Sequence, residues 1–231
     1  MATAAVGLVT IGQSPRTDVV PDIAARLPPG TPVLERGALD DADPGELARL
    51  APAPGEEVLV SRLRDGTQVT LAEARVLPRV QDAVDHVTGR GAAVVAVLCT
   101  GTLPRPRCRQ PVLLPGAMVR SLVAAAADGA RLGVVVPDPG QIGPARADWA
   151  GVAGPVLVLA ASPYGPPASL RQAAGTLAAF GPDLVVLDCL GFGAPMKQVV
   201  AQAVGVPVIL PRTVLAGALA ALLGEPPGAR R

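Results

Sequence analysis

Two cysteines in matching surroundings are the residues of this sequence best suited to chemistry. Cys99 lies in Gly91–Gly101, which reads GAAVVAVLCTG. Cys189 lies in Gly181–Gly191, which reads GPDLVVLDCLG. In both segments the cysteine follows the first glycine by eight residues and precedes the second by two. A thiolate can act as a base or a nucleophile, so two thiols at equivalent positions could act on one small molecule from two sides.

The surroundings of the two cysteines are part of a wider internal similarity. VGLV at Val6–Val9 resembles LGVV at Leu132–Val135, and PVLLP at Pro111–Pro115 resembles PVILP at Pro207–Pro211. A single cysteine at a strand end is more often a small buried hydrophobe than a functional group. Two at matched positions, each followed by a glycine, favour a functional role for at least one of them.

Composition narrows the function classes. The net charge of +1 and the 2% aromatic content supply neither a basic surface nor stacking platforms, which argues against nucleic-acid binding. No apolar run has the length of about 20 residues that a membrane span requires. The N-terminal sequence MATAAVGLVTIGQSPR has no cationic segment typical of a signal peptide. Three widely spaced cysteines favour a reducing compartment over a disulfide scaffold, so we expect a cytoplasmic protein.

Short β-branched runs alternate with helical patterns, which is typical of an α/β fold with parallel sheets buried on both faces. We expect two pseudo-symmetric flavodoxin-like halves, residues 1–130 and 131–231, each with a four-stranded sheet. The last helix could pack back on the first half, and the tail 225–231 is expected to be loose. The expected strands are residues 5–10, 32–35, 92–98, 112–114, 132–136, 156–160, 184–188 and 206–210. The expected helices are residues 78–87, with Pro78 in the first turn, and residues 117–127, 170–180, 196–203 and 213–223.

The first half carries an insertion near residues 37–71. It contains VLVSRLRDGTQVTL, in which Asp65-Gly66 separates two alternating runs. An Asp-Gly pair in this setting predicts a β-hairpin. The hairpin could cover a binding cleft, form a partner surface, or be a surface ornament.

The first turn after a strand has residues suited to an anion. Gly12, Ser14 and Arg16 lie in TIGQSPRTD, at the sheet edge where ligands of parallel α/β folds bind. A guanidinium can clamp a carboxylate or phosphate with two hydrogen bonds. The pattern is not the GxGxxG of dinucleotide-binding folds. An ordinary turn with a solvent-exposed arginine is an equal alternative, and the matching turn of the second half, Pro137–Gln141, has no arginine.

Other candidates give weaker signals. Thr100, Gly101 and Thr102 follow Cys99 and could donate to a substrate oxygen, although hydroxyls in such turns more often cap the next segment. The basic segment Arg105–Arg109 is more typical of a solvated loop than of a lid. Asp188 should point away from Cys189, because side chains alternate along a strand. One histidine, His86, and scattered cysteines match no metal-site spacing, so we expect no metal.

Several of these motifs together resemble the AroM family. TIGQSPRTDV, PGEEVLVSRLRDGTQV, LCTG, LGVVVP and LDCLGFG carry the resemblance, which spans nearly the whole chain. The duplicated, cysteine-bearing architecture is in turn similar to the aspartate/glutamate racemase superfamily, which includes hydantoin racemases, maleate isomerase and arylmalonate decarboxylase. That resemblance implies cleft cysteines and no cofactor.

The residues after each cysteine depart from the amino-acid racemases. Those enzymes typically have Cys-Asn-Thr in the first half, where this chain has Cys99-Thr100-Gly101. Their second site reads Cys-Thr followed by His or Glu, where this chain has CLGF, closer to the Cys-x-Gly of hydantoin racemases. A non-amino-acid carboxylate or a cyclic imide therefore fits better than aspartate or glutamate.

These inferences predict a cofactor-independent racemase or isomerase acting on a small carboxylate-type ligand. Cys189 is assigned as the principal acid/base or nucleophile and Cys99 as the opposing group, with Thr100 and Gly191 orienting the oxyanion. The alternative is a non-catalytic metabolite-binding or regulatory protein linked to aromatic metabolism. A homo-oligomer is left open.

Overall fold

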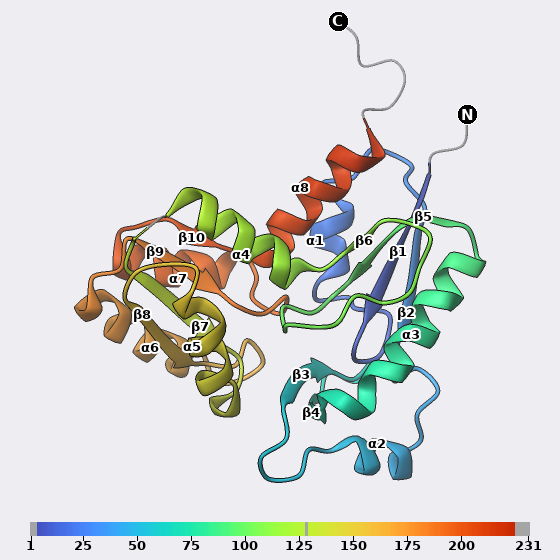
Figure 1. The fold of residues 1–231 in the computed structure, drawn as a ribbon, viewed down its shortest axis with the longest axis horizontal. Coiled ribbons are helices and arrows are strands. Elements are labelled where there is room, and N and C mark those ends of the chain that lie inside the picture. Colours follow the sequence, from blue (N-terminus) through green and yellow to red (C-terminus); the bar gives the residue numbers. More distant parts are fainter. Residues whose placement is uncertain (1–3, 128, 225–231) are drawn as a thin grey trace, which may run out of the picture. The chain divides into compact units, whose positions relative to one another are not determined.

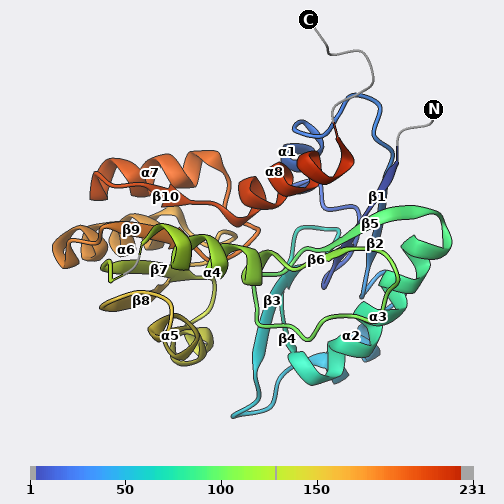
Figure 2. The ribbon, with the colours of Figure 1, turned by 45° about the horizontal axis from the view of Figure 1, so that its top comes forward.

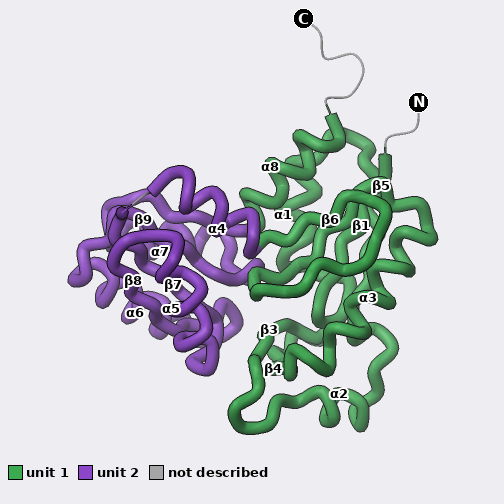
Figure 3. The backbone as a smooth tube through the Cα atoms, viewed as in Figure 1, with its two compact units in different colours: residues 1–115, 212–231 green, residues 116–211 purple. Residues whose placement is uncertain are grey.

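The computed structural model describes residues 4–127 and 129–224; the tail expected to be loose, 225–231, lies outside them. The chain divides into two compact units, coloured separately in Figure 3. Unit 1 is Met1–Pro115 with Arg212–Arg231, and unit 2 is Gly116–Pro211. The chain therefore passes between units twice, directly before Gly116 and directly before Arg212.

Unit 1 is built on a parallel sheet of four strands in the order β2-β1-β5-β6. The strands are β1 (Ala5–Thr10), β2 (Val33–Gly37), β5 (Ala92–Val97) and β6 (Val112–Leu113). Helix α3 (Glu73–Gly89) covers one face of the sheet, and the short α1 (Val20–Ala24) lies beside α8 (Pro211–Leu223) on the other, as Figures 1 and 2 show. Both faces are thus covered, as expected for a parallel sheet.

Close packing of α3 on β1 depends on a glycine. A Cβ added to Gly7 would lie 2.7 Å from Cγ2 of Val87, a buried residue of α3. In unit 2, a Cβ on Gly133 would lie 2.7 Å from Cδ2 of Leu177 in the helix α6 (Pro167–Phe180). The glycine shared by the VGLV and LGVV segments therefore has the same steric role in both units.

The predicted hairpin is present as β3 (Val58–Arg62) and β4 (Gln68–Ala72), paired antiparallel. Gly66 has a φ of 95° and lies in the turn that joins the strands, where the Leu63 N–H donates to the Thr67 carbonyl at 2.8 Å. Leu59 and Leu71 are buried in the core of unit 1. The hairpin is therefore part of the unit's core and not a surface ornament.

Unit 2 has a second parallel four-stranded sheet, in the order β10-β9-β7-β8. Its strands are β7 (Leu132–Val136), β8 (Val156–Ala160), β9 (Leu184–Leu187) and β10 (Val208–Ile209). Its helices are α4 (Pro115–Ala126), α5 (Ile142–Ala150), α6 and α7 (Ala194–Val204), with a 3-10 turn η1 (Pro139–Gln141) before α5. Numbered within their own unit, the main-sheet strands of both units have the order 2-1-3-4, so the two sheets share one topology.

The α/β fold class is confirmed. Strand bounds differ by a few residues, as in β2 and β10, and the larger differences from prediction lie in the helices. Pro78 was predicted in a first turn, but α3 begins five residues earlier at Glu73 and contains Pro78. Helices α1, α2 (Pro44–Leu50) and α5 were not predicted. Helix α2 had a sequence signal, because Asp43 and Glu46 form a capping box at its N-terminus.

No helix in residues 4–127 and 129–224 is long and apolar enough to cross a membrane.

Candidate functional site

The turns that follow β5 and β9 have matching geometry. The Cys99 N–H donates to the Val97 carbonyl, and the Cys189 N–H to the Leu187 carbonyl, both at 2.8 Å. The residue before each cysteine donates to the central neighbouring strand, from Leu98 to Val9 at 2.6 Å and from Asp188 to Val135 at 2.8 Å. Each cysteine is therefore fixed at the carboxyl end of the third strand of its sheet.

Each sulfur also accepts a backbone hydrogen bond from its own turn. The Gly101 N–H donates to Cys99 Sγ at 3.4 Å, and the Gly191 N–H donates to Cys189 Sγ at 3.4 Å. A donor directed at sulfur favours the thiolate over the thiol, which is the form needed for base or nucleophile chemistry. Neither cysteine forms a disulfide; Cys99 is half-buried and Cys189 is 8% exposed.

The two turns differ in what covers the glycine. A Cβ on Gly101 would lie 3.0 Å from Cδ2 of Leu59, an aliphatic side chain of the hairpin. A Cβ on Gly191 would lie 2.5 Å from the Tyr164 hydroxyl oxygen and 2.7 Å from Cγ of Pro163. The two turns have the same backbone geometry, but the turn in unit 1 lies against an apolar group and the turn in unit 2 lies against a phenol.

The first loop after β1 lies against the hairpin. The Gly12 N–H donates to Thr10 Oγ1 at 3.2 Å, and a Cβ on Gly12 would lie 2.3 Å from the Arg62 carbonyl oxygen. Ser14 donates from both its N–H and its hydroxyl to the two oxygens of Asp40, each at 2.7 Å. Gly12 and Ser14 are therefore part of the internal structure of this loop.

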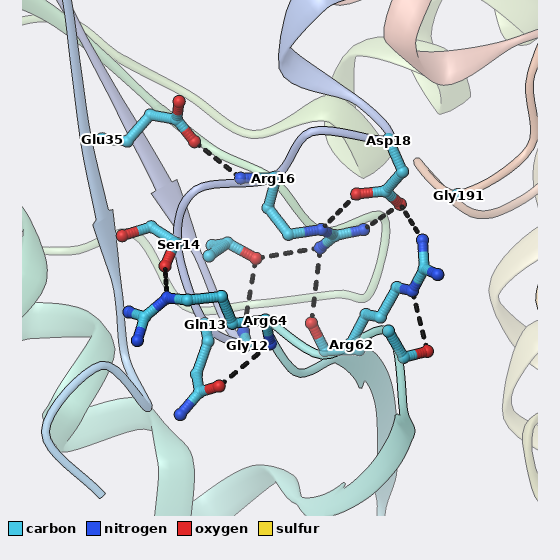
Figure 4. Close-up of polar contacts among 12 residues, drawn as sticks. Gly12, Gln13, Ser14, Arg16, Asp18, Glu35, Arg62, Arg64 and Gly191 are labelled. Carbon is cyan, nitrogen blue, oxygen red and sulfur yellow. Dashed lines mark hydrogen bonds and ion pairs between the residues drawn. The ribbon is translucent and has the colours of Figure 1, made fainter.

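Arg16 is buried, with 4% of its side chain exposed. Its Nε and Nη2 donate to the two carboxylate oxygens of Asp18 at 2.8 and 2.9 Å. Its Nη1 donates to Thr10 Oγ1 at 3.0 Å and to Ser61 Oγ at 3.5 Å (Figure 4). The guanidinium thus clamps a carboxylate as expected for this group, but the carboxylate belongs to the protein.

Two opposing effects act on the pKa of Asp18. Burial raises the pKa of this carboxyl, while hydrogen bonds and charge from Arg16, with the more distant charge of Arg62, lower it. The arginines outweigh burial, so the pKa of Asp18 lies below its ordinary value. Asp18 is therefore an ionised partner for Arg16 at neutral pH.

The hairpin and the first loop are joined by further hydrogen bonds (Figure 4). The Gln13 N–H donates to the Arg62 carbonyl at 3.1 Å, and its Oε1 accepts from the Arg64 N–H at 2.9 Å. Arg64 Nε donates to the Ser14 carbonyl at 2.7 Å. TIGQSPR and the Asp-Gly hairpin, far apart in sequence, thus form one network.

We expect Gly12→Ala to destabilise the fold by about 2 kcal/mol, because its Cβ would displace the hairpin backbone. Urea unfolding followed by circular dichroism measures this. Gly89→Ala is the matched control in unit 1, because a Cβ there meets nothing within 4 Å. If the Gly12 variant and the wild type have the same free energy of unfolding, the loop and the hairpin do not pack tightly.

The remaining predicted residues are placed as follows. Thr100 is 9% exposed, whereas Thr102 is exposed. The loop that contains the basic segment is held on α3, because Gln81 donates to the Arg107 carbonyl at 2.9 Å and accepts from its N–H at 2.8 Å. Asp188 accepts from the Trp149 indole N–H at 3.1 Å. His86 is exposed.

A pocket of about 130 Å³ lies elsewhere in unit 1 and contains no predicted anion-binding or cysteine residue. Its lining consists of Arg36, Gly37, Ala38, Asp41, Arg79, Asp82, Ala83 and His86. Within residues 4–127 and 129–224, no cluster of three or more His, Cys, Asp or Glu side chains could hold a metal ion.

Sequence reasoning missed three side chains that define these surroundings. Asp18 was read only as part of the loop, although a carboxylate two residues after Arg16 is a ready partner for it. Tyr164 follows a strand end of unit 2 and is the single tyrosine of the chain, which could have drawn attention to it. Trp149 lies in a helix that had no clear periodicity.

Comparison with known proteins gives the family. The model of the AroM family, described as "AroM protein", matches residues 6–223. The chain belongs to the AroM family. A search of curated proteins found no match.

Solved structures of low sequence identity share the fold. Allantoin racemase from Klebsiella pneumoniae is 16% identical with a TM-score of 0.63, covering 96% of this chain and 94% of its own. An unliganded arylmalonate decarboxylase is 20% identical with a TM-score of 0.58, and the match covers 99% of this chain and 96% of the decarboxylase. A third structure is glutamate racemase from Francisella tularensis subsp. tularensis SCHU S4 in complex with D-glutamate. It is 14% identical with a TM-score of 0.61, and the match covers 96% of this chain and 82% of the racemase. The chain has the fold of the aspartate/glutamate racemases, with the hairpin as a separate antiparallel pair.

Proposed function

We propose that this protein is a cofactor-independent racemase or isomerase that acts on a small carboxylate or cyclic imide. Cys189 is the principal acid/base or nucleophile, and Cys99 is the second thiol. The observation that carries the proposal is the matched pair of Cys-x-Gly turns, in which a glycine N–H lies 3.4 Å from each sulfur. A merely buried cysteine does not need the same donor in two different sheets.

The proposed chemistry is proton transfer at a carbon acid. A thiolate takes the proton from the carbon next to a carboxylate or carbonyl, and the C–H electron pair moves into a planar enolate. A thiol then returns a proton to the enolate. Return to the opposite face of the same carbon inverts its configuration, and return to a different carbon gives an isomer. Because charge develops on the ligand oxygen, donors near that oxygen lower the barrier. We assign this task to groups around Thr100–Thr102 and Gly191.

The comparisons support the class of ligand. The similar structures include racemases and decarboxylases, and one of them is a complex with D-glutamate, a small carboxylate. Absence of the Cys-Asn-Thr pattern in this chain favours a carboxylate without the α-amino group, or a cyclic imide. The three cysteines form no disulfide, which favours a reducing compartment, so we also propose a cytoplasmic location.

The surroundings of Arg16 favour a second candidate function. Since this guanidinium already binds Asp18, an incoming carboxylate would compete with a partner inside the protein. A chain that had lost catalysis could keep this network for its fold alone. The alternative is therefore a non-catalytic metabolite-binding or regulatory protein, which a ligand would stabilise without turnover.

Thiol alkylation tests the role of the two turns. Cys108 lies outside both turns, where its Sγ donates to Gln110 Oε1 at 3.1 Å, so it serves as an internal control. We expect Cys99 and Cys189 to react with iodoacetamide at pH 7 about tenfold faster than Cys108, as followed by peptide mass spectrometry. If Cys108 reacts fastest, the turns do not activate their cysteines.

A further inference from the structure

The loop between β8 and α6 places a phenol beside the Cys189 turn. The position that a Cβ on Gly191 would take is 2.5 Å from the Tyr164 hydroxyl oxygen and 2.8 Å from Cζ of the same ring. The hydroxyl therefore lies next to the glycine whose N–H is directed at Cys189 Sγ. Tyr164 is half-buried.

The backbone around Tyr164 is fixed. The Ala161 N–H donates to the Val136 carbonyl at 2.9 Å, which ties the start of the loop to β7. The Tyr164 N–H donates to Ser162 Oγ at 3.0 Å, and the Gly165 N–H to the Ser162 carbonyl at 3.2 Å. A donor held in advance loses little entropy when it binds a ligand.

A different side chain occupies this place in the corresponding turn of unit 1. Leu59, from the hairpin, lies near Gly101 where the phenol lies near Gly191. The side chains that pack on the two glycines therefore differ, an aliphatic group in one turn and a phenol in the other. The hydroxyl of a phenol is a hydrogen-bond donor, so it can donate to an oxygen of a ligand.

We propose that the Tyr164 hydroxyl donates a hydrogen bond to a carboxylate or carbonyl oxygen of the ligand that reacts at Cys189. This proposal rests on the proposed function and adds a residue to it. Charge develops on that oxygen as the carbon acid loses its proton, so the hydrogen bond is stronger in the transition state than in the ground state. Tyr164 would therefore raise the rate of the chemical step.

Alkylation with iodoacetate tests the contact without a known substrate. The Cys189 sulfur forms a bond to the methylene carbon, the carbon–iodine bond breaks, and iodide leaves. The reagent's carboxylate is adjacent to that carbon, where Tyr164 could bind it. We expect Tyr164→Phe to slow carboxymethylation of Cys189 about tenfold, as expected for one hydrogen bond to a charged group.

Two controls accompany this variant. Methyl methanethiosulfonate, which has no carboxyl group, should modify Cys189 in Tyr164→Phe at the wild-type rate within about twofold. Cys99, measured in the same digests, should react with iodoacetate equally in both proteins, because Leu59 stands in the corresponding place. A general loss of structure would change all of these rates together.

A second measurement uses the unaltered chain. The protein contains one tyrosine, so the change in ultraviolet absorbance that accompanies phenolate formation reports on Tyr164. Carboxymethylation of Cys189 should move ionisation of the phenol to a higher pH than thiomethylation does, because a nearby carboxylate disfavours the phenolate. Unchanged carboxymethylation in Tyr164→Phe, or identical titrations of the two modified proteins, would overturn the role of Tyr164. Failure of the proposed function would be seen in a different experiment: the wild-type protein would not exchange the α-carbon hydrogen of any candidate acid for deuterium in D₂O.

Discussion

Replacing Cys189 with alanine is expected to lower the rate of carbon–hydrogen exchange on the protein's substrate by about 1,000-fold, because general acid–base groups contribute on this order. The alanine removes the sulfur to which we assign the proton transfer, while the Gly191 N–H loses its acceptor. Cys189 is 8% exposed and packs among apolar neighbours, so alanine fits the space without a clash. The measurement is deuterium incorporation followed by NMR.

Two further variants separate chemistry from structure. Cys189→Ser keeps a hydrogen-bonding group of similar shape but supplies a much weaker acid, so its exchange should fall nearly as far. Cys108→Ala removes a thiol that lies outside both turns and should exchange at the wild-type rate. Full activity in Cys189→Ala would remove Cys189 from the mechanism.

Asp18→Asn is expected to destabilise the protein by about 3 kcal/mol at pH 7. It leaves the buried Arg16 without its carboxylate, and loss of one partner of a buried ion pair costs on this order. Urea unfolding of both proteins measures the difference. The sequence suggests a solvent-exposed or ligand-binding arginine here; the structure shows that Arg16 is buried and paired with Asp18.

The pH dependence follows from the lowered pKa of Asp18. The folded-state pKa lies below the ordinary value of 3.8, so the ion pair contributes its stability above that pH. The contribution is lost as the pH falls through the folded-state pKa. We therefore expect the stability difference between wild type and Asp18→Asn to be full at pH 7 and to shrink progressively below about pH 4.

Asp41→Asn is the matched control for this prediction. Asp41 is paired with Arg36, but its side chain is 75% exposed, so water screens the pair. Its substitution should change stability by less than about 1 kcal/mol. If Asp18→Asn behaves like Asp41→Asn, or if its effect does not depend on pH, the buried pair is not what stabilises this loop.

The sheets could be predicted closely because their strands are short, apolar and β-branched. Residues 5–10, 132–136 and 156–160 were predicted as strands and are β1, β7 and β8 with the same bounds. The short helices were missed because α1 has five residues and α5 has no marked apolar face. Pro78 misplaced a boundary because a proline, which lacks a backbone N–H, is expected in a first turn, whereas α3 contains it in its interior.

The chemistry around the cysteines could be predicted only in part. The repeated spacing around Cys99 and Cys189 is visible in the sequence, and both residues lie in matched turns. The contact of Arg16 with Ser61 could not be found in this way, because Ser61 is 45 residues distant and is brought near by the hairpin. Tyr164 approaches Gly191 by the same kind of tertiary contact, which no local pattern encodes.

Deuterium exchange by the wild-type protein tests the central claim most directly, because proton abstraction from carbon leaves a label whatever the product is. The protein is incubated in D₂O with malonates, aryl-substituted carboxylates, hydantoins and amino acids, and the α-carbon is followed by NMR. The proposed function predicts that at least one of these acids gains deuterium with the wild type and none does with Cys189→Ala. If an acid stabilises the fold but no acid acquires deuterium, the protein binds its ligand without catalysis and the proposal is wrong.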